Sequence, residues 1–231
     1  MSVAVLSGAD AQLPPRVGAL ARFAAALTAE PWALSKGVAD DLAGQGFGED
    51  AVEAATGVVA MFNYLTRVAD ATGIEFDYTS PLPAFEPDLA KKAVTRPDRS
   101  SWPVVPGERR TFPRFAALSE AWQRWHGYVF DSDEPLTHRE RQLLACAAAQ
   151  ECCDRWRADQ LREYAPQNAT ESGLVEFARK LSREPWQMEP ADLDDLRDLG
   201  YLEVALLHAI AVVALQNAES RLAMGRALSG S

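Results

Sequence analysis

The sequence predicts an all-α protein built on an internal repeat, and two observations carry this expectation. Residues 20–69 recur without a gap at residues 174–223, with a constant offset of 154 and 20 identities among the 50 paired positions. Apolar residues follow the helical period in both copies, whereas no segment shows the alternation typical of a β-strand. We therefore expect one packing unit used twice, with the intervening segment held between the copies.

The first copy is expected to form two or three helices. Apolar residues from Leu20 to Leu27 follow the helical period. Ser35 is suited to cap a short helix that ends near Gly46, because serine accepts from free backbone donors and glycine permits a left-handed exit. A longer helix is expected over residues 49–72.

The second copy repeats this pattern. Pro190 lies at an expected helix start and Gly200 at an expected stop. The long helix of this copy, over residues 203–228, is apolar on most faces between Val204 and Leu215 and is expected to be central. Each copy also contains an Asn-x3-Arg pair, Asn63 with Arg67 and Asn217 with Arg221. Because the pair is duplicated, we expect it to be structural, capping helices or pairing with acids between them.

Residues 76–113 differ from the rest of the chain in composition. Seven of the 14 prolines lie here, and proline removes backbone donors and restricts the residue before it. The segment is also basic, with Lys91, Lys92, Arg96, Arg99, Arg109 and Arg110. It is either a connector or packing arm, or a segment that binds an anion or covers a substrate.

The third part begins with an amphipathic helix expected over residues 114–130. Its aromatic and aliphatic stripe is expected to be core, and His126 adjoins it; the stripe comprises Phe115, Leu118, Trp122, Trp125 and Val129. Thr137 and Glu140 have the spacing of a capping box, and a helical run is expected from Arg139 to about Tyr164. The expected organisation is a first copy over 1–75, a connector over 76–113, and motif helices plus the second copy over 114–231, in one compact unit.

Composition excludes several classes of function. The net charge of −10 and the pI of about 4.8 do not suit a uniform nucleic-acid surface, which needs excess lysine and arginine. No stretch approaches the roughly 20 apolar residues of a membrane span, and the amino-terminal residues do not resemble a signal peptide. We therefore expect a cytoplasmic protein, in which the three cysteines form no disulfide framework. His126, His138 and His208 show no metal-ligand spacing with the cysteines, so no metal or cofactor is expected.

Candidate chemistry is concentrated in residues 139–164. Cys152, Arg155 and Asp159 would share one face of a continuous helix, and a neighbouring arginine favours the reactive thiolate. Glu140 would meet Cys152 only if the helix broke between them, near residues 149–151, because 12 residues of helix span roughly 18 Å. The alternatives are that Glu140 is only a cap, that the cysteines are buried small residues, and that Arg155 and Asp159 form an i,i+4 ion pair.

These residues resemble the alkylhydroperoxidase D-like and carboxymuconolactone decarboxylase-like proteins. The peroxidase branch carries Glu-x11-Cys-x2-Cys-x3-His, in register with Glu140 and Cys152, and the repeated unit is similar to the family's Phe-Asn-x3-Arg-x-Ala signature at residues 62–69. The similarity covers roughly residues 20–75 and 115–228. It implies a helical bundle, oligomerisation, and a thiol pair that attacks a peroxide while Glu and His relay protons. Here Arg155 replaces the second cysteine and Asp159 the histidine.

Three hypotheses about function follow, with Cys152, Glu140, Arg155, Asp159 and His126 as candidate catalytic residues. The first is a thiol-dependent peroxidase that acts on a hydroperoxide. The second is a cofactor-free decarboxylase or isomerase, in which Glu140 and Asp159 act as acid and base on a small carboxylate held by Arg155. The third is an inactive member of the superfamily that keeps the fold. In each case a homo-oligomer is expected.

Overall fold

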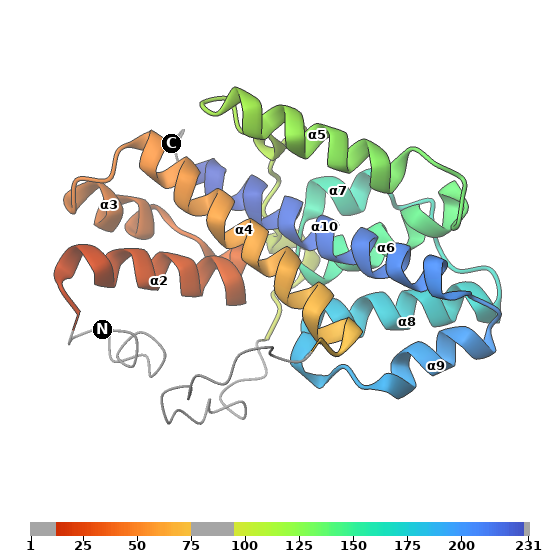
Figure 1. The fold of residues 1–231 in the computed structure, drawn as a ribbon. Helices are drawn as coiled ribbons and strands as arrows, with labels where there is room; N and C mark the ends of the chain where they lie inside the picture. Colours follow the sequence, from red (N-terminus) through yellow and green to blue (C-terminus); the bar gives the residue numbers. More distant parts are fainter. Residues whose placement is uncertain (1–12, 75–94, 229–231) are drawn as a thin grey trace.

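The computed structural model describes residues 13–74 and 95–228, and every regular element in these ranges is helical, which confirms the all-α prediction (Figure 1). The α-helices are α2 (Pro15–Ala29), α3 (Lys36–Gly44), α4 (Glu49–Thr72), α5 (Ala116–Phe130), α6 (His138–Glu151), α7 (Arg155–Gln160), α8 (Ala169–Arg183), α9 (Pro190–Asp198) and α10 (Glu203–Ala227). The 3-10 helices are η2 (Pro31–Ala33), η3 (Arg99–Ser101), η4 (Gly107–Arg110) and η5 (Pro185–Gln187).

The elements recur with the spacing of the sequence repeat. Helices α8, η5, α9 and α10 each begin 154 residues after α2, η2, α3 and α4, respectively. The expected helix start and stop residues are confirmed, since α9 begins at Pro190 and both Gly46 and Gly200 have a positive φ. Ser35 is the N-cap residue of α3, although its side chain makes no capping hydrogen bond.

The two long helices α4 and α10 pack against each other at the centre of the molecule (Figure 1). A Cβ atom built on Gly225 of α10 would lie 2.5 Å from Thr56 Cγ2 of α4, so only glycine permits this close approach. Helix α10 is buried along most of its length and also contacts α6, α8, α5, η4 and α2. It is therefore the central helix, as its apolar sequence predicts.

The duplicated arginines hold the two copies together in a reciprocal exchange. Arg67 of α4 donates to the Ser182 carbonyl oxygen in the last turn of α8 (2.9 Å). Arg221 of α10 donates to the Thr28 carbonyl oxygen in the last turn of α2 (2.8 Å). The asparagine four residues before each arginine binds within its own copy. Asn63 donates to the Thr28 hydroxyl at 3.1 Å, and Asn217 donates to the Ser182 hydroxyl at 2.8 Å. The arginines thus satisfy free carbonyls at helix ends. Their other hydrogen bonds within the described residues go to the asparagine four residues earlier and, for Arg221, to Cys152 Sγ, and none goes to an acid, contrary to one expectation.

The predicted helical run over residues 139–164 is wrong, because a turn separates α6 from α7. Cys153 has a φ of 54°, in the left-handed region. The amide of Asp154 donates to the Ala149 carbonyl oxygen, and that of Cys153 donates to the Gln150 carbonyl oxygen, the pattern of a Schellman ending. The Asp154 side chain then accepts from the amide of Arg157 and starts α7. The cysteine in the left-handed position hides this stop, which glycine would have marked.

The stripe on α5 is core only in part. Trp122 and Val129 are buried, whereas Phe115, Leu118 and Trp125 are 36%, 39% and 37% exposed. The helix begins at Ala116 rather than residue 114. Periodicity marks an apolar stripe correctly but does not show whether another element covers it.

The described part of the connector lies against α6 and α7. Arg96 forms an ion pair with Glu151 at the end of α6, and Arg99 pairs with α7. Arg110 in η4 reaches Asp154 between the two helices. The connector is therefore anchored by its basic residues from residue 96 onward. The predictions for Pro81, Pro83 and Pro87 and for Lys91 and Lys92 concern residues outside the described ranges.

Candidate functional site

Glu140 and Cys152 lie at opposite ends of α6 and do not meet. Helix α6 continues from His138 to Glu151 without a break, so the two residues are separated by roughly 18 Å along the axis. Glu140 accepts from the Thr137 amide and hydroxyl (both 2.8 Å), which forms the expected capping box. It also accepts from the Tyr201 hydroxyl (2.6 Å). Its contacts are those of a capping residue.

Arg155 and Asp159 form an ion-pair network on the surface of α7. Their side chains are 40% and 47% exposed, and Arg155 Nε lies 3.6 Å from Asp159 Oδ2. Arg99 Nη2 donates to Asp159 Oδ1 at 2.7 Å and lowers the pKa of that carboxyl. Because the turn at Cys153 rotates α7 away from α6, neither residue shares a helical face with Cys152. They attach η3 to α7, which agrees with the ion-pair alternative.

Cys152 is buried between the two copies. Its Sγ atom lies 3.2 Å from Asn217 Oδ1, to which it donates, and 3.4 Å from Arg221 Nη1. Burial, together with the positive charge of the nearby Arg221, lowers the pKa of Arg67 to about 9. Cys152 is only 2% exposed and lines neither of the two pockets described below. Burial raises the pKa of the adjacent Cys153 to about 12, so that thiol stays protonated at neutral pH.

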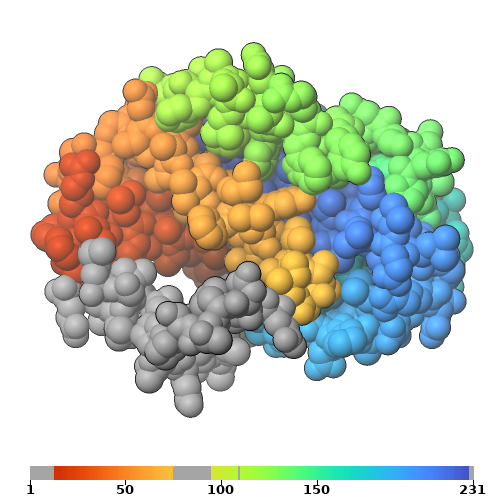
Figure 2. Space-filling view, in the orientation of Figure 1, coloured from red at the N-terminus to blue at the C-terminus, as the bar shows by residue number. Residues whose placement is uncertain are grey.

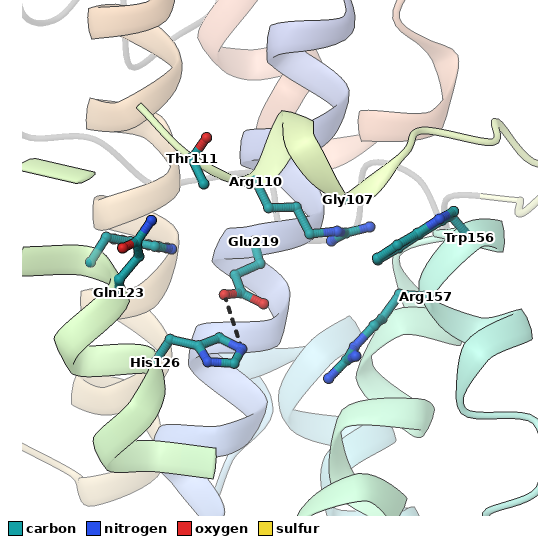
Figure 3. A pocket seen from close by; sticks show the side chains of 9 residues that line it. Gly107, Arg110, Thr111, Gln123, His126, Trp156, Arg157 and Glu219 are labelled. Atoms are coloured by element: carbon teal, nitrogen blue, oxygen red, sulfur yellow. Dashed lines mark ion pairs between the residues drawn. The ribbon is translucent and has the colours of Figure 1, made fainter. Parts of the chain in front are cut away.

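The larger of the two pockets lies elsewhere, between α5, η4, α7 and α10, and has a volume of about 260 Å³ (Figure 3). Its lining consists of Gly107, Arg110, Thr111, Trp122, Gln123, His126, Trp156, Arg157 and Glu219. The smaller pocket, of about 180 Å³, lies beside Cys146, whose pKa is raised by burial. Of the five candidate catalytic residues named from the sequence, only His126 lines the larger pocket.

His126 and Glu219 form the acid–base pair of the pocket. His126 Nε2 on α5 lies 3.7 Å from Glu219 Oε1 on α10, and the side chains point toward each other (Figure 3). The imidazole is 39% exposed, whereas the carboxylate is 6% exposed. The exposed ring is therefore placed to exchange a proton with a molecule in the pocket.

Arg157 brings a cation to the same pocket. Its Nε donates to Gln216 Oε1 at 3.2 Å, and its guanidinium lies over the Phe130 ring. No hydrogen bond from its two terminal nitrogens to any described residue is found. Burial lowers the pKa of Arg157, while the charge of Glu219 opposes that shift. A partly desolvated guanidinium with free terminal donors is suited to bind an anion.

Asp154 organises the wall of the pocket. It is 1% exposed and accepts from Arg110 Nη2 at 2.8 and 2.7 Å, from the Ser220 hydroxyl at 2.7 Å, and from the Arg157 amide at 3.2 Å. Arg110 also lies over the Trp156 ring, 4.8 Å from its centroid. A buried charge with this many donors is held in one geometry, and Asp154 thereby positions both arginines of the pocket.

Two residues of the wall carry buried donors that have no partner within the described ranges. These atoms are Arg110 Nε and Nη1 and Trp122 Nε1. Because these atoms are buried, a molecule in the pocket reaches them only if the wall moves. The residues that line the pocket nevertheless supply mostly donor groups, among them those of Gln123 and Arg157. The pocket is therefore chemically suited to an acceptor-rich ligand.

Most residues of this pocket could not be predicted from the sequence. Arg110 belongs to the basic connector, for which anion binding was one alternative, but no local motif distinguishes it from its neighbours. Glu219 has a signal in the repeat, because the paired position in the first copy is Leu65. Gln216 similarly pairs with Phe62. Polar replacements on an otherwise apolar repeated helix indicate where the two copies differ in function.

Comparisons with family models, curated proteins and solved structures give no match to this chain. Within the described residues, no group of three or more His, Cys, Asp or Glu side chains is placed to hold a metal ion. In the same ranges no single helix is long and apolar enough to cross a membrane. The bent pair of α9 and α10, with an angle of 119°, passes that test by length and composition alone.

Proposed function

We propose that this protein is a cofactor-free enzyme that catalyses proton transfer on a small carboxylate in the pocket between α5, η4, α7 and α10. One observation carries the proposal: Arg157, whose terminal nitrogens bond to no residue in the described ranges, lines the same pocket as the His126–Glu219 pair. We further propose that the chain adopts an alkylhydroperoxidase D-like bundle with an internal repeat. The matching spacing of its elements supports this.

The proposed reaction uses only groups of this chain. Arg157 binds the substrate carboxylate, and His126 removes a proton from the carbon next to a carbonyl or double bond. The electron pair of the broken C–H bond moves into the adjacent π system, where the arginines stabilise the developing negative charge. Glu219 stabilises the imidazolium, which returns the proton at the same or another carbon. The outcome is exchange or isomerisation, without any change in oxidation state.

The carboxylate chemistry expected from the sequence is thus assigned to a different set of residues. Arg157 replaces Arg155 as the cation, because Arg155 is engaged on the surface of α7. His126 and Glu219 replace Glu140 and Asp159 as the acid–base pair. The chemistry expected from sequence is retained, while the residues that supply it come from three elements that only the fold brings together.

Exchange of α-protons in D2O tests the proposal, with levulinate and 3-butenoate as probes and NMR as the readout. Wild-type protein is expected to accelerate deuterium incorporation, and His126→Gln is expected to lose about 100-fold or more of that rate. Arg157→Gln is expected to raise the half-saturating probe concentration roughly 10-fold or more. Arg155→Gln is the matched control, since it removes an arginine from the same helix outside the pocket. Equal rates in wild type and His126→Gln would refute the proposal.

A second candidate, thiol-dependent peroxide reduction at Cys152, is favoured by the contact between Arg221 Nη1 and Cys152 Sγ. In that reaction the thiolate attacks a hydroperoxide oxygen, forms sulfenic acid and releases the alcohol, and an added thiol reduces the product. Intact mass after a pulse of tert-butyl hydroperoxide tests it. A rapid, dithiothreitol-reversible gain of one oxygen in wild type but not in Cys152→Ala would support it. An unchanged mass would eliminate it.

A further inference from the structure

The two copies of the repeat differ in how their long helices are covered. Four positions on α4 are exposed apolar side chains: Val58 (58%), Met61 (39%), Phe62 (61%) and Leu65 (47%). The paired positions on α10 are almost completely buried: Val212, Leu215 and Gln216 at 0% and Glu219 at 4%. The same face of the same repeated helix is thus buried in one copy and open in the other.

The segment between the copies explains this difference. Helices α5, α6 and η4 contact α10, and α7 reaches it through the Arg157–Gln216 hydrogen bond. The segment occurs once in the chain. It also touches α4, through Phe112 against Gly57 and Trp125 against Tyr64, but it leaves this face of α4 exposed. The exposed face of α4 consequently has the apolar character of a covered face without the cover that α10 receives.

Ring contacts connect this face to exposed apolar residues of α5 and α10. Tyr64 meets Trp125 edge-on with centroids 6.1 Å apart, Trp125 stacks on Tyr128 at 5.3 Å, and Tyr128 contacts His208 at 5.4 Å. The surfaces of α4, α5 and α10 adjoin on the face shown in Figure 2. We name the whole surface the α4 patch; its exposed apolar members are Val58, Met61, Phe62, Leu65, Trp125, Tyr128, Val204 and Leu207.

The size of the α4 patch matches one side of a protein interface. Eight side chains exposed by about half, with roughly 150–250 Å² for each large aromatic and less for the aliphatic ones, present roughly 700 Å² of apolar surface. A stable interface buries about 800 Å² on each partner, whereas exposed patches beyond a few hundred Å² generally mark interaction sites.

The absence of charged residues from these parts of α4 and α10 favours a second copy of the chain as the partner. Residues 54–66 of α4 and 204–218 of α10 contain no Asp, Glu, Lys or Arg, although the chain carries a net charge of −10. A partner selected by charge would find no complementary charge there. Two copies of this acidic chain, in contrast, meet with least repulsion through an uncharged apolar face, and a two-fold axis lets one patch bury its own equivalent.

We propose that the α4 patch is the interface through which two copies of this chain associate across a two-fold axis. The partner's patch then covers α4 as the inserted segment covers α10. This inference is independent of the proposed reaction, because the four α4 residues do not line the pocket.

Sedimentation equilibrium of the full chain tests the inference. Wild type is expected to contain at least two copies per particle at micromolar concentration. Phe62→Asp combined with Leu65→Asp is expected to weaken association roughly 100-fold or more, with unchanged circular dichroism, because both side chains are already exposed. Trp186→Asp is the control, since Trp186 is 52% exposed outside the patch.

Three outcomes would overturn the inference. The first is a wild-type chain that sediments as a monomer. The second is an association that the Phe62 and Leu65 substitutions leave unchanged. The third is an association that Trp186→Asp disrupts to the same extent. If the double variant loses folded structure, cysteine-directed cross-linking of Phe62→Cys in otherwise native protein replaces it; absence of a cross-linked dimer would then refute the interface.

Discussion

Removing the charge of Asp154 is the perturbation whose effect the structure defines best. The carboxylate accepts four hydrogen bonds from three residues, and both it and Arg110 are more than 90% buried. In Asp154→Asn only one oxygen remains to accept, so either the Ser220 hydroxyl or the Arg157 amide, which bind different carboxylate oxygens, no longer donates to the side chain, while an amide group faces the Arg110 guanidinium. Because this leaves a buried cation without a counterion, we expect a loss of roughly 3–5 kcal/mol in the free energy of unfolding.

Urea unfolding followed by circular dichroism measures this loss, and the midpoint of thermal unfolding should fall by roughly 6–20 °C for a chain of this size. Arg110→Met in the Asp154→Asn background removes the orphaned cation, so the double variant should be more stable than Asp154→Asn alone. Asp159→Asn, which removes a carboxylate from an exposed ion pair of the same helix, should leave the midpoint unchanged within error. A loss below about 1 kcal/mol, or additive effects of the two substitutions, would refute the reasoning.

Three further predictions concern the packing, the acid limb of stability and a helix cap. Gly225→Ala should destabilise the protein by about 1–3 kcal/mol through the clash with Thr56, whereas at an open helical position it would stabilise by about 0.5–1 kcal/mol; thermal unfolding gives the sign, and Thr56→Ala should restore part of the loss. Burial and the nearby Arg141 lower the pKa of His208 in the folded protein below the 6.5 of the unfolded chain. As the pH drops below 6.5, the unfolded chain therefore takes up the proton before the folded protein does, and the free energy of unfolding should fall. His208→Gln should weaken that fall between pH 7.5 and 5.5 in urea titrations, and an unaltered pH profile would contradict the assignment. Thr137→Ala should cost about 1 kcal/mol by removing the capping box, and a loss within error in urea unfolding would show that the cap is dispensable.

Local signals predicted the elements of each copy well. The helical period over residues 49–72, the proline at 190 and the glycines at 46 and 200 all mark element bounds that the structure confirms. Capping at Thr137 was equally readable, because a capping box depends on residues three apart. These signals are reliable because the interactions behind them lie within one turn of helix.

The break at residues 152–154 illustrates why the candidate site was less predictable. A continuous helix would have placed Cys152, Arg155 and Asp159 on one face, but a cysteine in the left-handed conformation ends α6 there. That conformation is unfavourable for a cysteine in isolation and is maintained by burial and by the partners of Asp154. Local propensity therefore predicted continuity, and tertiary contacts overrode it.

The sequence by itself determined the all-helical class, the spacing of the two copies and the presence of His126 and a basic connector among candidate functional residues. Only the tertiary structure decided which of these groups meet. Arg110, His126, Arg157 and Glu219 come from segments more than 100 residues apart at the extremes, and no pattern in the chain specifies their convergence. Helical periodicity records which faces are apolar, whereas packing decides which faces are covered: it buries Glu219 in a pocket and leaves Leu65, its counterpart in the repeat, at the surface.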